Sequence, residues 1–172
     1  MSVKKLRLFL TPDLEKEERW LTQMSAQGLH FKKYRMCVYT FEADPDKAYI
    51  YQIGFQQNAD ETYFKGFEND GWKLVDHSAG MYHFFRHENK EIAAEDLHSE
   101  TEMHDYYDKM LNFHMLLFIS AFCIMFGTFF SLGTISNVLQ IIVVIVLGFL
   151  ALVHLYIIVR LFKKSKLIKS SR

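Results

Sequence analysis

Histidines are the residues of this chain whose chemistry can be judged most directly from spacing, because imidazole binds metals and transfers protons near neutral pH. His77, His83 and His87 lie close together, with Asp76 and Glu88 beside two of them. On one strand, His83 and His87 would share a face but stand about 13 Å apart at 3.3 Å per residue. The zinc signatures HExxH and paired CxxC do not occur in the sequence. We therefore expect solvated or hairpin-packed histidines, with no metal site and no cofactor.

Two further histidines, His114 and His154, lie inside long apolar runs. Ionisable side chains are rare in membrane-spanning helices and are often functional there. For His154 we predict an intramembrane polar contact, either between two spans or at the membrane interface. A role in proton transfer is the alternative.

Signatures of catalysis are missing from the sequence. It contains no GxSxG, no glycine-rich phosphate loop and no acid pair with a recognisable partner. The basic group of Lys32, Lys33 and Arg35 is smaller than a nucleic-acid platform requires. It is interpreted as a solvated strand edge or as a contact with anionic lipid. The sequence therefore favours a protein that is neither an enzyme nor a nucleic-acid binder.

Aromatic residues are unusually dense in the first half of the chain. The favoured interpretation is an aromatic core that fills a small α+β domain, and a pocket or exposed sheet face for an apolar ligand is the alternative. The residues concerned are Phe9, Trp20, Phe31, Tyr34, Tyr39, Phe41, Tyr49, Tyr51, Phe55, Tyr63, Phe64, Phe67, Trp72, Tyr82, Phe84 and Phe85.

The last third of the chain holds two long apolar runs, residues 111–132 and 138–162. At about 1.5 Å per helical residue, each is long enough to cross a hydrocarbon core of about 30 Å. No Asp, Glu, Lys or Arg occurs between Leu111 and Arg160, so neither run has a charged face. These features predict a two-helix transmembrane hairpin.

Charge around the hairpin predicts its orientation. Residues 163–172 are rich in lysine, whereas the link at residues 133–137 is uncharged. Basic flanks favour the cytoplasmic side, so the N- and C-termini are both expected in the cytoplasm. The expected location is a plasma membrane, crossed twice.

An internal repeat organises the soluble part. A shift of 43 residues brings Gly28 onto Gly71, and it aligns large apolar residues on both sides of these glycines. Each unit reads as strand, helix, strand, strand, with the glycine at the left-handed residue that ends the helix. The predicted fold class is α+β, with a duplicated β-α-β-β sheet domain whose helices cover one face. Such units can close into one antiparallel sheet.

These patterns divide the chain into four segments. Residues 1–87 form the cytoplasmic α+β domain, with units at about 4–43 and 47–87. Residues 88–110 are expected to form an acidic linker helix. Residues 111–162 form the hairpin, and residues 163–172 form the basic tail.

Several short sequences resemble a bacterial family known only as a domain of unknown function. They include Lys16-Glu17-Glu18-Arg19-Trp20-Leu21, the Gly28-Leu29 step, Tyr51-Gln52-Ile53 and Phe67-Glu68-Asn69-Asp70-Gly71-Trp72, and the resemblance covers roughly residues 4–108. It implies a small cytoplasmic module followed by membrane spans, often encoded beside PadR-type repressors. It implies no activity and no catalytic residues.

The function expected from these features is non-enzymatic: a membrane-tethered sensing or adaptor module for a protein partner or an apolar small molecule, with a role in envelope stress. The alternative is an accessory subunit of a transporter or an immunity-type protein that acts through its hairpin. Alternation along residues 48–56 turns Ile50, Gln52 and Gln56 away from the aromatic core, so we expect the partner or ligand face there. The bilayer is the other expected partner, and homo-oligomerisation is left open.

Overall fold

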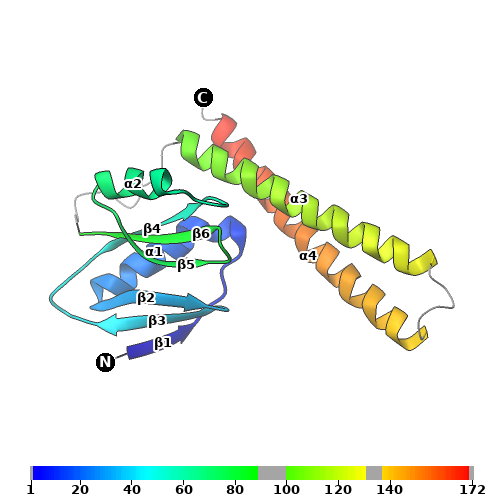
Figure 1. Ribbon diagram of the computed structural model, residues 1–172, viewed down its shortest axis with the longest axis horizontal. Coiled ribbons are helices and arrows are strands. Elements are labelled where there is room, and N and C mark those ends of the chain that lie inside the picture. The colour runs from blue at the N-terminus through cyan, green and yellow to red at the C-terminus, as the bar shows by residue number, and fades with distance from the viewer. Residues whose placement is uncertain (1, 89–99, 131–136, 171–172) are drawn as a thin grey trace. The chain divides into compact units, whose positions relative to one another are not determined.

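The computed structural model describes residues 2–88, 100–130 and 137–170 (Figure 1). The chain divides into two compact units, Met1–Ser99 and Glu100–Arg172. The first unit is α+β and the second is helical, which confirms the predicted fold class.

The first repeat consists of β1 (Ser2–Leu6), a short 3₁₀ turn (Thr11–Asp13), α1 (Leu14–Ala26), β2 (Leu29–Arg35) and β3 (Val38–Ala43). Pro12 lies in the turn that leads into α1, where its missing N–H costs no helical hydrogen bond. Gly28 follows the helix with a φ of +78°, as the sequence predicts. The three strands form an antiparallel sheet in the order β1-β3-β2 (Figure 1).

The second repeat consists of β4 (Ile50–Phe55), α2 (Glu61–Asn69), β5 (Lys73–Ser78) and β6 (Tyr82–His87). Its sheet has the matching order β4-β6-β5, and Gly71 has a φ of +84°. Each sheet also has a register shift at the same place in its second strand, between Phe31 and Lys33 in β2 and between Leu74 and Asp76 in β5. The shared geometry of the two units is therefore confirmed in detail.

Hydrogen bonding divides the strands into two three-stranded sheets, so the expected single sheet is not formed. Strands β2 and β5 lie next to each other. The Tyr34 N–H donates to Oδ2 of Asp76 at 2.7 Å, and the Arg35 guanidinium lies 3.0 Å from the same oxygen. A bulge in each strand disrupts a regular ladder, and the Asp76 carboxylate joins the sheets instead.

Helix α1 packs against β2 and β4 and protects the free edge of β4. The N–H groups of Tyr49, Tyr51 and Ile53 donate to side-chain oxygens of α1 at 2.8, 3.1 and 2.7 Å. The acceptors are Ser25, Thr22 and Glu18 in that order, spaced so that they share one face of the helix. These bonds satisfy alternate N–H groups that an edge strand would otherwise leave unpaired.

The second unit consists of α3 (Glu100–Phe130) and α4 (Asn137–Ser170), which pack as an antiparallel pair (Figure 1). Both helices are long and apolar enough to span a membrane. Large apolar side chains point outward along them, including Leu116 and Phe149, each 66% exposed. In the expected linker segment, residues 100–110 are continuous with α3, and residues 89–99 lie outside the described residues.

Candidate functional site

The aromatic residues of the first unit form the core that the sequence predicts. Phe31, Tyr39, Phe41, Tyr51 and Phe84 are nearly or fully buried. Their rings meet across the repeats, with the Phe31 centroid 5.0 Å from that of Phe84 and 6.1 Å from that of Tyr51. Edge-on and tilted ring pairs of this kind stabilise a core beyond their buried area.

One acidic side chain lies at the margin of this core. The Tyr39 hydroxyl donates to Oε1 of Glu17 at 2.6 Å, which draws the carboxyl of α1 toward β3. Burial raises the pKa of Glu17 to about 7, although the Tyr39 hydrogen bond opposes the rise and the nearby Glu18 charge adds to it. The Glu17 residue is nonetheless partly exposed.

Two more tyrosines lie within the electrostatic range of this carboxyl. Tyr34 and Tyr82 are partly exposed, and burial raises the pKa of each hydroxyl. The Glu17 charge raises the pKa values of Tyr34, Tyr39 and Tyr82 alike, although in each case it ranks below burial. All three phenols therefore lie within the electrostatic range of one carboxyl.

Two further rings complete what we call the Glu17 cluster, defined as Phe9, Glu17, Trp20, Tyr34, Tyr39 and Tyr82. The Phe9 ring packs on Trp20 at 5.6 Å and on Tyr39 at 6.2 Å. The Arg7 guanidinium lies 4.9 Å from the ring centroids of both Phe9 and Trp20, so these rings already form cation–π contacts within the chain.

A carboxyl bordered by aromatic rings is suited to recognise an apolar cation. The rings offer dispersion contacts and negative ring faces, and the ionised carboxylate offers a full opposite charge. Partial burial strengthens that charge interaction because less water screens it.

The expected partner face is not an exposed surface. Ile50 and Gln52 are each 7% exposed, and Gln56 is partly exposed beyond the end of β4. Ile50 packs with Trp72 and Phe85 beneath Tyr63, Phe64 and Phe67. Helix α2 therefore covers the side of β4 that we expected to be free, and this expectation is corrected.

Two of the clustered histidines, His77 and His83, are directly opposed on the paired strands β5 and β6. Nε2 of His83 lies 3.1 Å from the Gln56 carbonyl oxygen, and the His87 ring packs on Trp72 at 5.2 Å. In the part of the chain that the structure describes, no group of three or more His, Cys, Asp or Glu could hold a metal ion.

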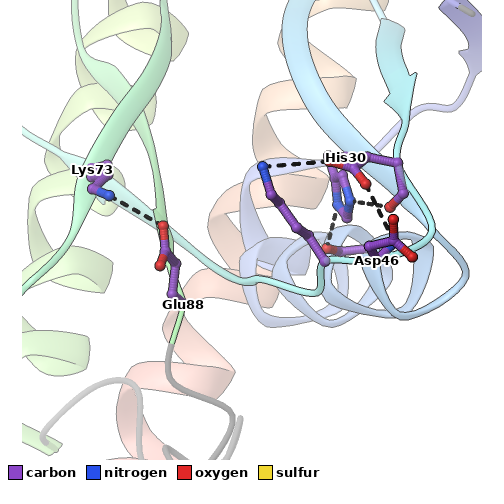
Figure 2. Close-up of polar contacts among 7 residues, drawn as sticks. His30, Asp46, Lys73 and Glu88 are labelled. Atoms are coloured by element: carbon purple, nitrogen blue, oxygen red, sulfur yellow. Dashed lines mark hydrogen bonds and ion pairs between the residues drawn. The ribbon is translucent and has the colours of Figure 1, made fainter.

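A buried serine–histidine pair forms a structural link between the repeats. Nδ1 of His30 lies 2.8 Å from Oγ of Ser25, and its Nε2 lies 2.7 Å from the Asp44 carbonyl oxygen. Figure 2 shows His30 directed toward the turn that contains Asp46. Since Ser25 is fully buried and also accepts the Tyr49 N–H, it fixes the connection rather than presenting a nucleophile.

In the helical unit, the His154 ring lies beside a histidine ring of the other helix. Its ring centroid lies 5.4 Å from that of His114, and its Nδ1 lies 2.8 Å from the Leu150 carbonyl oxygen of its own helix. Further along the helix pair, Nε2 of Gln140 donates to the Thr128 carbonyl oxygen at 2.6 Å. Polar groups therefore lie between α3 and α4 at two levels.

Sequence reasoning missed Glu17 as a site residue. The signal was spacing: Glu17 and Glu18 each lie three or four residues from both Leu14 and Leu21. Glu18 is on the stripe that the helix buries, and Glu17 borders it. A carboxyl on the buried stripe of an amphipathic helix is costly unless it has a partner.

Comparison with known proteins adds a family but no activity. Residues 13–119 match the family described as Protein of unknown function (DUF2812), which confirms the resemblance seen in the sequence. The matched segment includes Glu17, Tyr34, Tyr39 and Tyr82. No curated protein and no solved structure gives a significant match.

Proposed function

The chain belongs to the DUF2812 family, and for this member we propose a non-enzymatic, membrane-tethered sensing module whose first unit binds an apolar cation at the Glu17 cluster. The observation that carries the proposal is the partly exposed Glu17 carboxyl, held by Tyr39 and bordered by aromatic rings. Occupancy of this site would be passed on to a protein partner, for example in the response to a toxic apolar compound.

Binding is expected to depend on the ionised form of Glu17. Its pKa is raised to about 7, so the fraction of carboxylate increases roughly tenfold between pH 6 and pH 8. The affinity for a cation should rise with pH over the same interval, because binding requires the charged form. The probe is tetraphenylphosphonium, and titration calorimetry on the purified full chain at pH 6, 7 and 8 measures its affinity.

The matched variants are Glu17→Gln and Glu68→Gln. Glu17→Gln keeps the shape of the side chain and should lower the affinity roughly tenfold, which corresponds to about 1.4 kcal/mol. It should also abolish the pH dependence. Glu68 is an exposed residue of α2, and its replacement should change neither quantity. Equal affinities for the wild type and Glu17→Gln would contradict the proposal.

We also propose that both helices cross the plasma membrane and that both termini lie in the cytoplasm. The basic tail and the uncharged link support this orientation. Epitope tags beside Ser2 and Arg172 should be protected from external protease in intact cells, whereas a tag inserted at Thr134 should be cleaved. Cleavage of the N-terminal tag would contradict this topology.

The alternative function is that of an accessory subunit of a transporter or an immunity-type protein acting through its hairpin. The polar contacts between α3 and α4, at His114–His154 and Gln140–Thr128, favour it specifically. The two functions make different demands on the Glu17 cluster. A hairpin-based activity would survive Glu17→Gln, whereas a cation sensor would lose its response.

A further inference from the structure

The end of the first sheet carries large apolar side chains in the open. Leu6 is 80% exposed, Leu8 is 70% exposed and Met36 is 90% exposed. They lie at one end of the sheet, because Leu6 pairs with Val38 and the Arg7 N–H donates to the Cys37 carbonyl oxygen at 2.9 Å. We call these three residues the apolar tip.

The hairpin turn within this tip places Met36 in a backbone conformation that disfavours a large side chain. Met36 and Cys37 both have positive φ, 46° and 66°, and the turns that favour such values prefer Asn-Gly or another glycine-containing pair. In the second repeat, the equivalent turn has Ala79 and Gly80, also with positive φ. The first repeat thus keeps a long, exposed thioether where a small residue suits the backbone better. Strain retained at an exposed position indicates a role in binding.

A basic face adjoins the apolar tip. Lys4, Lys33 and Arg35 are exposed on β1 and β2 and are in register with Thr40 or Val38 of the central strand β3. Arg35 also forms the ion pair with Asp76 at 3.0 Å, so Lys4 and Lys33 supply most of the positive charge of this face. The adjacent Lys32 is exposed and forms an ion pair with Glu42 at 3.0 Å. Paired residues of an antiparallel sheet point to the same side, so this side is opposite the buried Tyr39 and Phe41. Tyr39 and Phe41 pair with Lys5 and Val3.

We propose that the apolar tip and the basic face dock on an anionic lipid surface, with Leu6, Leu8 and Met36 inserted among the acyl chains. Clustered Lys and Arg are attracted to acidic headgroups, and aliphatic side chains gain from transfer into hydrocarbon. A nucleic acid would match the charge but would leave the aliphatic side chains without a partner, because bases stack on aromatic rings. The same chain has two helices that are long and apolar enough to span a membrane, which supports a bilayer as the surface of this chemistry. This inference does not rest on cation binding at Glu17.

The test uses the full chain in nanodiscs. A photoreactive benzoylphenylalanine replaces Met36 in one sample and Lys65, an exposed residue of α2, in the control. The nanodiscs contain either equal parts of phosphatidylglycerol and phosphatidylcholine or phosphatidylcholine alone. After illumination, mass spectrometry quantifies lipid and protein adducts.

We expect lipid adducts at position 36 to be at least fivefold more abundant in the anionic nanodiscs and to exceed those at position 65. Lys4→Glu combined with Lys33→Glu should lower them at least fivefold, since each basic residue near an anionic surface contributes about that factor. In the protein that keeps Lys4 and Lys33, raising the salt concentration should also lower the lipid adducts at position 36, because salt screens the attraction to the headgroups. The fold should not change.

Three results would overturn the proposal. The first is equal lipid labelling in the two nanodisc compositions, and the second is equal labelling at positions 36 and 65. The third is labelling of protein in place of lipid, which would assign the tip to a contact between chains.

Discussion

Ile50→Asp is expected to destabilise the first unit severely, with a loss of about 3 kcal/mol or more in the free energy of unfolding. Ile50 is 7% exposed and packs with Trp72 and Phe85 beneath the aromatic residues of α2. A carboxylate at this position would lose its hydration without gaining a partner. Thermal denaturation, followed by the near-ultraviolet signal of the surrounding aromatic residues, measures the effect.

Two control substitutions separate the cost of burying a charge from the cost of changing Ile50 and from that of adding a charge to the sheet. Ile50→Val removes one methylene group and should cost about 1 kcal/mol. Leu74→Asp introduces the same charge in the same sheet, but Leu74 is 44% exposed, so the loss should be much smaller. Equal melting temperatures for Ile50→Asp and the wild type would show that the Ile50 side of β4 is exposed to solvent.

The comparison of sequence and structure explains why this face was misjudged. Alternation along β4 correctly separates Tyr51 and Ile53 from Ile50 and Gln52, because side chains alternate in any strand. It does not reveal that both sides are covered, one by the aromatic core and the other by α2. Gln52 is polar, which predicts a solvent-exposed position, yet its side chain is only 7% exposed.

Local signals were more reliable than tertiary ones. Gly28 and Gly71 end their helices with positive φ, because this requirement is set by the backbone alone. Where the two sheets meet, by contrast, Asp76 accepts the Tyr34 N–H from a strand 42 residues away in the sequence. The Glu17 cluster likewise joins residues from α1, β2, β3 and β6, and no short sequence window contains them together.

Gly54→Ala is expected to destabilise the first unit through steric overlap at the new Cβ atom. A Cβ atom at Gly54 would overlap the Tyr63 hydroxyl oxygen and lie 3.2 Å from Cε2 of Phe85. The backbone of Gly54 does not have positive φ, so the contact alone sets the cost. Overpacking of this kind costs about 1–3 kcal/mol. Gly66→Ala is the control, because nothing lies within 4 Å of that Cβ position and alanine favours the helix by about 0.5–1 kcal/mol.

Tyr63→Phe should rescue Gly54→Ala, because it removes the atom that the new methyl group meets. In the described residues the Tyr63 hydroxyl is buried without a hydrogen-bond partner, and burial raises its pKa to about 12. Its removal alone should therefore be neutral or stabilising, by up to about 1 kcal/mol. In a double-mutant cycle measured by thermal denaturation, the two substitutions should couple favourably by at least about 1 kcal/mol. Additive losses would mean that α2 does not hold Tyr63 against β4.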